Sequence, residues 1–336
     1  MSHKNLTQKN WTSWHHLLHK ELLSDKKLLP NGANLLIAVS GGQDSMALLN
    51  LINDIKTQHN WIVHVWHGDH QWHAESERYA LELKSYCAEK GITFFFDRGI
   101  KKTISSEEKA RDWRYKKLSK RANQLLSESQ KDIDIYLLTG HTSTDNAETF
   151  LLNLARGSNY AGLSYIEKKR LLEHNIFLIR PLLIFSREDT KTICKLMNIP
   201  IWEDPSNSDL KIKRNLVRKK IIPTFETIYP GCSKRINSFA KKMGSYNEEQ
   251  QDLGKLAYLS CKDVKGLKRK LLNSLCIEAR CTIFNIFLKK NCTKQLNSNN
   301  ISNIASSIFE KDRGEINLPE KFKIIWNKDY IDIKKS

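Results

Sequence analysis

Short apolar runs alternate with amphipathic stretches along the first two thirds of the chain. The apolar runs have the length of buried strands, and the stretches between them place apolar residues at helical spacing. The sequence predicts strands over residues 35–39, 61–66, 92–96, 133–139 and 176–184. It predicts helices over residues 10–23, 46–55, 76–90, 105–126, 144–156 and 187–197. This alternation of strand and helix indicates an α/β fold.

The alternation also predicts the sheet and the domain division. Strands that alternate with helices form a parallel, doubly wound sheet with helices on both faces and ligands at the carboxyl ends of the strands. We assign residues 1–223 to this domain. Residues 224–336 are richer in Lys and Asn, and alternation within 314–333 favours a hairpin. We predict a smaller, mainly helical second domain there.

The charge balance points to a polyanionic partner. Lys and Arg number 55 against 37 Asp and Glu, which gives a formal net charge of +18. The basic residues recur along the whole chain, as expected of a folded surface that follows a nucleic-acid backbone. A lysine- and asparagine-rich composition inherited from an AT-rich genome is the competing explanation, and both explanations can hold.

The cysteines and the apolar runs limit the compartment. Seven cysteines are scattered without a Cys-x-x-Cys pair, which favours free thiols in a reducing compartment. We see no apolar run long enough to cross a bilayer and no secretory signal. We therefore expect a soluble protein with no membrane partner.

The segment Ser40-Gly41-Gly42-Gln43-Asp44-Ser45 follows the first strand and opens a helix. Glycines at a helix N-terminus let backbone N–H groups approach an anion, so this turn is typical of a phosphate cradle. Asp44 fits beside an anion when magnesium lies between them. Neither the Walker pattern nor the dinucleotide-binding pattern occurs. A tight strand-to-helix turn without a ligand is the alternative.

A second group of polar residues follows the fourth strand. His141, Asp145 and Glu148 are spaced by four and three residues, which puts them toward one side of a helix start. Two carboxylates beside a histidine could hold a cationic amine and take a proton from it. Alternatively, the two carboxylates only complement the helix dipole.

Arginines form two further candidate groups. Arg111 and Arg114 lie one turn apart on the predicted helix over 105–126, where they could reach a phosphate or lie on a solvated face. Arg214 and Arg218 begin a basic helix after a turn at residues 204–207.

Histidines recur at positions 64, 67, 70 and 73, with Asp69 among them. We do not favour zinc, because His64 and His67 would face opposite sides of a strand and no cysteine lies near. Asp69 and His70 are more simply placed in the loop after the second strand, over a bound nucleotide.

Taken together, these segments resemble one family, the tRNA(Ile)-lysidine synthases, within the ATP pyrophosphatases that carry a pyrophosphate (PP) loop. The resemblance runs in the family's order over residues 35–218. Its motifs are Ser40-Gly41-Gly42-x-Asp44-Ser45, Asp69-His70 with Ser76, Ala110-Arg111-x-x-Arg114-Tyr115, Gly140-His141 to Glu148-Thr149, Arg156-Gly157 with Gly162-Leu163, Arg180-Pro181-Leu182-Leu183, and Asp204-x-Ser206-Asn207 with Arg214-Asn215-x-x-Arg218.

The resemblance implies a reaction. ATP would adenylate the cytidine at the first anticodon position of a tRNA(Ile) with anticodon CAU, and free lysine would displace AMP to give lysidine. ATP would be bound by Ser40, Gly41, Gly42, Gln43, Asp44, Ser45, Asp69 and His70, with Asp44 on magnesium. Lysine would meet His141, Asp145 and Glu148. Phosphates of ATP or tRNA would meet Arg111, Arg114, Arg214 and Arg218, and residues 224–336 would bind tRNA.

Some expectations remain open at the level of sequence. Asn146 stands where many members carry an acidic residue or Gln, and about 110 residues follow the catalytic part. The alternatives are a tRNA-thiolating adenylase, a nucleotide- and RNA-binding protein without catalysis, and amidation of a small molecule. We expect a plastid stroma, with a bacterial cytoplasm as the alternative, and leave a homodimer open.

Overall fold

The computed structural model describes residues 11–24, 28–72, 74–100, 107–129, 133–202, 205–291, 298–319 and 322–335. The chain forms two compact units, Met1–Lys241 and Lys242–Ser336. They divide within helix α9 (Cys232–Cys261). The boundary predicted at residue 223 falls before this helix begins.

The first unit is built on a six-stranded sheet. Its strands are β1 (Asn34–Ala38), β2 (Ile62–Asp69), β3 (Thr93–Arg98), β4 (Ile135–Thr139), β5 (Lys169–Glu173) and β6 (Ile176–Ile179). Their order is β3-β2-β1-β4-β6-β5, and every neighbouring pair is parallel except β5 with β6. The predicted doubly wound parallel sheet is confirmed, with an antiparallel edge strand that the sequence pattern did not reveal.

The last predicted strand is shorter than expected. Residues 176–184 were predicted as one strand, but β6 ends at Ile179 and a 3-10 helix covers Pro181–Ile184. Pro181 has no N–H group to donate to a neighbouring strand and its φ angle is fixed, so the ladder ends before it.

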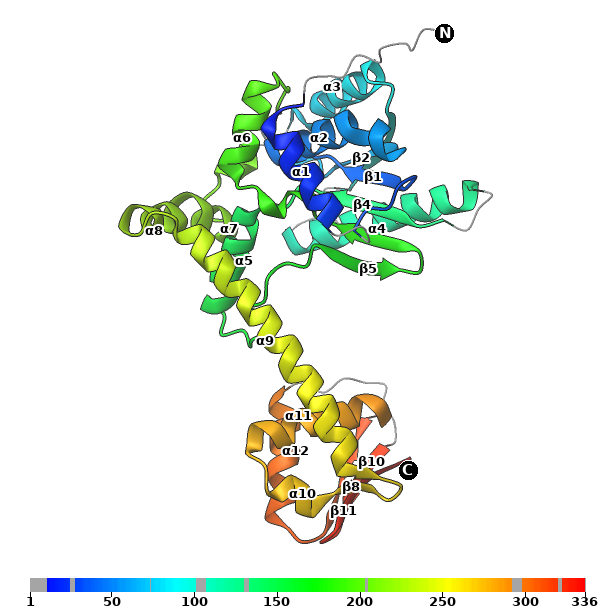
Figure 1. Cartoon of the computed structure of the whole chain (residues 1–336), viewed down its shortest axis with the longest axis vertical. Helices are drawn as coiled ribbons and strands as arrows, with labels where there is room; N and C mark the ends of the chain where they lie inside the picture. The colour runs from blue at the N-terminus through cyan, green and yellow to red at the C-terminus, as the bar shows by residue number, and fades with distance from the viewer. Residues whose placement is uncertain are drawn as a thin grey trace. The chain divides into compact units, whose positions relative to one another are not determined.

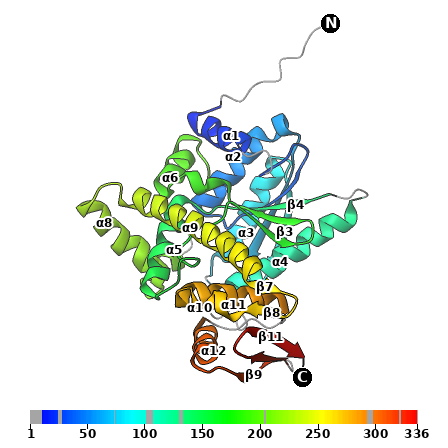
Figure 2. The ribbon, with the colours of Figure 1, turned by 60° about the horizontal axis from the view of Figure 1, so that its bottom comes forward.

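Helices connect these strands (Figures 1 and 2). In chain order they are α1 (Ser13–Ser24), α2 (Gln43–His59), α3 (Ser76–Glu89), α4 (Glu107–Glu128), α5 (Ser143–Ala155) and α6 (Arg187–Leu196). They match the predicted ranges to within a few residues. After α6 come the short elements η2 (Pro205–Ser208), α7 (Lys213–Leu216), η3 (Val217–Ile221) and α8 (Ile222–Ile228).

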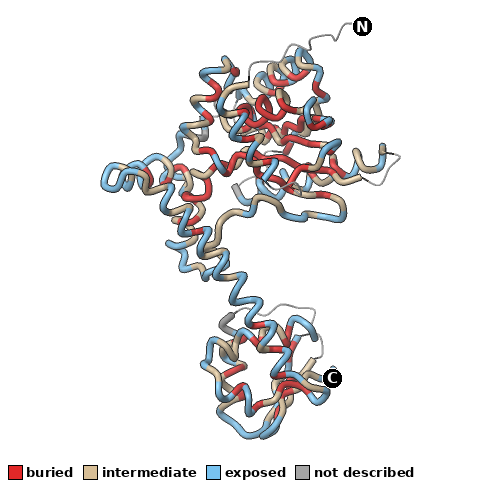
Figure 3. Tube along the Cα trace, viewed as in Figure 1, coloured by how far each residue is buried: buried red, intermediate tan, exposed pale blue. Residues whose placement is uncertain are grey.

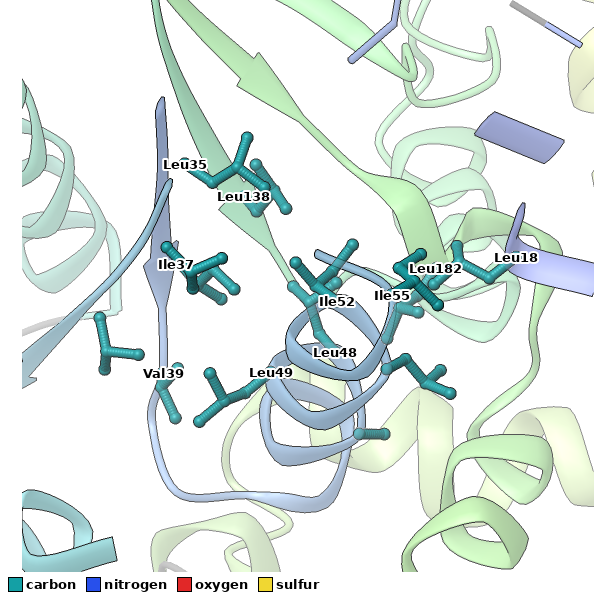
Figure 4. Close-up of a cluster of buried hydrophobic side chains, with 14 of the residues drawn as sticks. Leu18, Leu35, Ile37, Val39, Leu48, Leu49, Ile52, Ile55, Leu138 and Leu182 are labelled. Carbon is teal, nitrogen blue, oxygen red and sulfur yellow. The ribbon is translucent and has the colours of Figure 1, made fainter. Parts of the chain in front are cut away.

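Two hydrophobic cores lie on the two faces of the sheet. Successive side chains of a strand point to opposite faces, and on β1 Leu35 and Ile37 join a core with α1, α2 and α6, whereas Leu36 joins a core with α4. Figure 4 shows the first core, and Figure 3 shows how completely the central strands are buried. Burying one such leucine contributes about 1.5–3 kcal/mol. Apolar runs on both faces therefore select a covered, parallel sheet.

The strand order determines where a ligand can bind. The chain runs from β1 outward through β2 and β3, and then crosses to β4 on the other side of β1. The connections after β1 and after β4 therefore diverge at the carboxyl edge of the sheet. Such a switch point leaves a crevice at which α/β proteins bind their ligands.

The second unit contains helices and an antiparallel sheet. After α9 come β7 (Lys262–Asp263), β8 (Gly266–Lys268), α10 (Arg269–Asn273), α11 (Ile277–Asn291), α12 (Ser298–Glu310), β9 (Gly314–Leu318), β10 (Phe322–Trp326) and β11 (Tyr330–Lys335). The sheet order is β7-β8-β11-β10-β9. The predicted hairpin is confirmed by the antiparallel pairing of β10 with β11. Strand β9 lies within the predicted segment 314–333 but adds a third strand beside the hairpin, and the sequence analysis missed β7 and β8.

Arg269 anchors this second unit. Its side chain is buried, and its two terminal nitrogens donate to four backbone carbonyl oxygens at 2.6–2.9 Å. These oxygens belong to Ile308, Lys311, Asp312 and Asn327. One guanidinium group thus ties the start of α10 to the end of α12 and to the β10–β11 turn.

Within the described ranges, none of the helices combines the length and the apolar character needed to cross a bilayer.

Candidate active site

The turn between β1 and α2 forms a tight loop at the carboxyl edge of the sheet. Gly41 has a φ of +89°, which strongly favours glycine, and an added Cβ would lie only 3.3 Å from the ring of Trp202, a tight contact. The Ser40 N–H donates to Ser45 Oγ at 3.2 Å, and that hydroxyl donates to the Gly42 carbonyl at 2.9 Å. The two serines therefore close the loop.

The N-terminus of α2 is open to a ligand. Gly42 is the N-cap of this 17-residue helix, and no side chain of the described residues caps it. By contrast, α5 and α6 each begin with a capping box, formed by Thr142 with Asp145 and by Ser186 with Asp189. The first-turn N–H groups of α2 are thus left for an external acceptor, and phosphate oxygens are suited to that position. This arrangement fits the phosphates of a nucleoside triphosphate.

Helix α6 holds the acidic residue of the loop. Asp44 forms an ion pair with Arg187, at 2.8 Å from Oδ2 to Nη1, and accepts a hydrogen bond from the Thr190 hydroxyl. Gln43 Nε2 donates to the Arg187 carbonyl at 2.7 Å. Burial raises the pKa of the Asp44 carboxyl above its ordinary value, although Arg187 and Thr190 oppose the rise.

The donor set around Asp44 also fits magnesium. Within the part of the chain that the structure describes, no three His, Cys, Asp or Glu side chains gather as a metal cage. Magnesium at nucleotides needs only one or two carboxylates, because the phosphate oxygens and water complete its shell. Asp44, in the first turn of α2, supplies the carboxylate beside the loop.

The connection after β4 meets the loop Ser40–Ser45, which we call the PP loop after the family that the sequence resembles. A Cβ added to Gly140 would come within 3.0 Å of the backbone of Asp44 and Ser45, so a side chain there would separate the two segments. Next to it, His141 Nδ1 is hydrogen-bonded to the Thr139 hydroxyl at 2.9 Å. Burial and three nearby arginines outweigh Asp145 and hold the pKa of His141 far below its usual range, so the imidazole is neutral at pH 7.

Behind these segments lies a four-residue charge cluster, which we call the arginine–carboxylate cluster: Asp145, Glu148, Arg214 and Arg218. Glu148 is fully buried and accepts from Arg214 Nε at 2.8 Å and from Arg218 Nε at 2.5 Å. Asp145 Oδ1 accepts from Arg214 at 2.9 Å and from Arg218 at 3.2 Å. Two anions thus neutralise two cations.

The other oxygen of Asp145 is also occupied. It accepts hydrogen bonds from the backbone N–H and the hydroxyl of Thr142, both at 2.8 Å. Burial alone would raise the pKa of Asp145, but Arg214, His141, Thr142 and Arg218 outweigh it and hold the pKa below its usual range. Asp145 therefore caps the helix, as in the alternative interpretation, and also pairs with two guanidinium groups, whereas its contact with an amine stays a prediction.

For two arginines, the contacts differ from those predicted from the sequence. The sequence suggested Arg214 and Arg218 as phosphate contacts, whereas the structure places both guanidinium groups on Asp145 and Glu148. The same contacts cover the two carboxylates that were expected to face an amine. Asp145 and Arg218 nevertheless lie close enough to the loop for their charges to act on Asp44.

The remaining predicted residues lie at the same edge or beside it. Asp69 ends β2, accepts from the Gln71 N–H at 2.7 Å and lies 3.4 Å from Arg98, so its buried carboxylate shapes this turn. The His70 ring packs edge-on against Trp113 of α4, with ring centroids 4.9 Å apart.

On α4, the Arg111 guanidinium lies over the Tyr115 ring, 5.3 Å from its centroid. Arg114 lies on the same helix. Asp204, His73 and the side chains of Ser206 and Asn207 lie outside the described residues.

Asn146 has a structural role. Its side-chain amide donates to Asn237 Oδ1 of α9 at 2.8 Å, and its oxygen accepts from the Ile166 N–H at 2.8 Å. An acidic residue at this position could not donate to Asn237. Asn146, which departs from the family pattern, therefore has in Asn237 a hydrogen-bond acceptor that suits an amide.

The sequence analysis missed three residues of this site: Arg187, Thr190 and Trp202. The sequence analysis predicted only a helix over 187–197, although an arginine in the first turn of a helix at the carboxyl edge of the sheet was a usable signal. Trp202 donates its N–H to the Gly41 carbonyl at 3.0 Å and its indole N–H to Glu82. No local pattern reveals this contact.

Comparison with known proteins agrees with this geometry. Residues 15–225 match the PP-loop domain family. Over 336 residues, the whole of both chains, the protein is 76% identical to a tRNA(Ile)-lysidine synthase of Prochlorococcus marinus subsp. pastoris. The chain belongs to the tRNA(Ile)-lysidine synthase family.

One more distant relative and one solved structure show weaker similarity. A chloroplastic tRNA(Ile)-lysidine synthase of Pyropia yezoensis is 29% identical, over 90% of this chain and 91% of its own. A solved U34-tRNA thiolase of Methanococcus maripaludis superposes with a TM-score of 0.53 at 17% identity, over 69% of this chain and 77% of its own. The latter likeness concerns the fold alone.

Proposed function

We propose that this protein ligates free lysine to the cytidine at the first anticodon position of tRNA(Ile) with anticodon CAU, at the expense of ATP. The product, lysidine, pairs with A instead of G, so the tRNA decodes AUA instead of AUG. The main support is the uncapped PP loop lying against buried carboxylates, in a chain that is 76% identical to a tRNA(Ile)-lysidine synthase over its full length.

The first step activates the cytosine. Its ring carbonyl oxygen attacks the α-phosphorus of ATP, the bond between the α- and β-phosphates breaks, and pyrophosphate leaves. The loop over Ser40–Ser45 and the N-terminus of α2 would bind the leaving pyrophosphate and stabilise its charge. Asp44 would hold magnesium, which supplies further neutralisation at the phosphates when bound.

The second step joins lysine to the ring. The side-chain amine attacks the ring carbon, the carbon–oxygen bond breaks, AMP leaves with the oxygen, and the amine loses a proton. Asp145 and Glu148 would recognise the ammonium group by taking it in place of one of their arginine contacts. We assign His141 a hydrogen-bonding role toward the reacting groups, because a neutral imidazole with so low a pKa is a weak proton acceptor.

The tRNA would be held chiefly through its phosphates. Arg111 and Arg114 on α4 and the basic residues of 224–336 are our candidates for these contacts, in keeping with the net charge of +18. Contacts of this kind carry little sequence information. The discrimination of tRNA(Ile) must therefore depend on additional contacts to bases or to tRNA shape.

The relatives suggest the compartment. They are cyanobacterial and, in one case, chloroplastic, which matches the plastid or bacterial setting expected from the sequence. Because the 76% identical relative is cyanobacterial and the chloroplast relative is 29% identical, we favour a cyanobacterial cytoplasm over a plastid stroma. A homodimer stays an expectation that light scattering on the purified protein can test.

The direct test is a product analysis. Purified protein is incubated with ATP, magnesium, lysine and CAU-anticodon tRNA(Ile), and the nucleosides of the digested tRNA are weighed. We expect a cytidine heavier by one lysine less one water. Asp44→Ala should abolish the product, because the carboxylate beside the pyrophosphate is lost.

Asp252→Asn is the matched control, because this carboxylate is exposed on α9 and pairs only with Lys255 at 2.8 Å in the described structure. Its product yield should equal that of the unmodified protein. ATP turnover without a lysine adduct, but with sulfur incorporation from a donor, would replace the proposal with thiolation. Tight RNA binding without any ATP turnover would leave only a binding protein.

A further inference from the structure

Arg187 forms an ion pair with Asp44, the acidic residue of the PP loop. Its Nη1 lies 2.8 Å from Asp44 Oδ2, and among the described residues Asp44 is the recorded ion-pair partner of this guanidinium. A guanidinium carries five N–H donors in a planar fork that matches phosphate oxygens. One carboxylate oxygen does not exhaust them. About a third of the Arg187 side chain is exposed, at 31%, whereas Asp44 is 14% exposed, so the cation has the more open face.

The backbone of Arg187 is fixed independently of its side chain. Its N–H donates to Thr144 Oγ1 of α5 at 3.1 Å, and its carbonyl accepts from Gln43 Nε2 at 2.7 Å. The capping box of Ser186 with Asp189 begins the helix. Helix α6 is therefore docked on both α2 and α5 without the guanidinium, which is the movable part.

Asp44 needs a positively charged neighbour, because it is largely buried and lies near a second carboxylate. Without a cation, its buried carboxylate would lie beside Asp145, whose charge also raises its pKa. Arg187 and the Thr190 hydroxyl meet this need in the structure. A divalent cation that arrived with a nucleotide would compete with Arg187 for the same carboxylate oxygen.

From this geometry we infer that Arg187 is an exchangeable counter-ion of the PP loop. It neutralises Asp44 while the loop holds no nucleotide, and it turns to the pyrophosphate part of ATP when a divalent cation takes Asp44. Arg187 is thus a binding residue for the β- and γ-phosphates. This role rests on the proposed use of ATP, but it requires neither lysine nor tRNA.

Binding measurements on the full-length protein test the inference without catalysis. Arg187→Gln removes the competitor of the metal, so Mn²⁺ followed by electron paramagnetic resonance should bind more tightly than to the unmodified protein. In the presence of magnesium, inorganic pyrophosphate followed by calorimetry should bind about tenfold more weakly, because a charged hydrogen-bond donor is lost. Lys191→Gln, an exposed cation on the same helix, should change neither constant.

A second variant makes the opposite prediction. Asp44→Asn releases Arg187 from its ion pair, so pyrophosphate without any divalent cation should bind more tightly to this variant than to the unmodified protein. This experiment does not depend on how well Arg187→Gln folds.

A purely structural role for Arg187 predicts different results. The guanidinium would then stabilise α6 only, and both pyrophosphate affinities would stay unchanged while the melting temperature fell. Unchanged pyrophosphate binding in both variants would overturn the inference. A failed lysidine assay with the binding shifts intact would refute the proposed function and leave the counter-ion role standing.

Discussion

The partly buried Arg214 and Arg218 of the first unit and the buried Arg269 of the second are neutralised in different ways. In the first unit, Arg214 and Arg218 share the two carboxylates of the arginine–carboxylate cluster. In the second unit, the Arg269 guanidinium is bound by four backbone carbonyl oxygens. Carboxylates can exchange one cation for another, such as a substrate ammonium group, whereas carbonyls at the ends of elements serve one cation that belongs to the fold. On the proposed function, this difference separates a ligand site from a structural anchor.

The largest effect is expected from Arg269→Met. The substitution removes four charge-assisted hydrogen bonds and leaves the buried Ile308 carbonyl without its guanidinium donor, so the second unit should lose roughly 4–5 kcal/mol of unfolding free energy. Hydrogen exchange should show this loss in residues 242–336. Lys270→Met changes the exposed neighbour and should leave the exchange pattern as it was. A stable second unit in Arg269→Met would remove the distinction between anchor and site.

A smaller effect on stability, but a decisive one on activity, is expected from Glu148→Gln. The amide has nearly the same shape but leaves two partly buried guanidinium groups with one carboxylate, which costs about 3 kcal/mol. We expect lysidine formation to fall strongly while tRNA affinity, measured by filter binding, changes little. Equal loss of both would mean that the cluster only supports the fold, as Arg269 does.

The smallest effect is expected from Asp145→Asn, and it concerns how the free energy of unfolding changes with pH in the acid range. Because the pKa of Asp145 is lowered in the folded state, its contribution is present above the unfolded value of about 3.9 and is lost as the pH falls through the lower folded value. Denaturant unfolding from pH 5 to pH 2 should therefore show a flatter acid limb for Asp145→Asn. Asp252→Asn, at an exposed position, should keep the slope of the unmodified protein. Identical slopes in all three proteins would contradict the assignment.

Much of the first unit could be predicted from the sequence, for physical reasons. Strands buried on both faces leave continuous apolar runs, and parallel strands bring their carboxyl ends to one edge. The loop at Ser40–Ser45 and the segment at Gly140–Glu148 were therefore expected at the same edge, where the structure has them. Which partners these residues choose could not be deduced.

The pairing within the arginine–carboxylate cluster shows why. Arg214 and Glu148 are 66 positions apart, and the sequence offers many other basic residues, so no spacing rule selects this pair. Strands β7 and β8 were missed for a different reason. They have only two and three residues, too few for a periodic pattern to separate a strand from a loop.

The antiparallel edge strand β5 has a consequence for solubility. An exposed strand edge presents unpaired backbone groups to which another chain can add a strand. Here the outermost strand is short, carries Lys169, Arg170 and Glu173, and shifts register between Leu171 and Glu173. Charge and an irregular register both discourage edge-to-edge aggregation. Some of the excess basic charge of this chain thus keeps the sheet from growing into fibres, and is independent of its affinity for RNA.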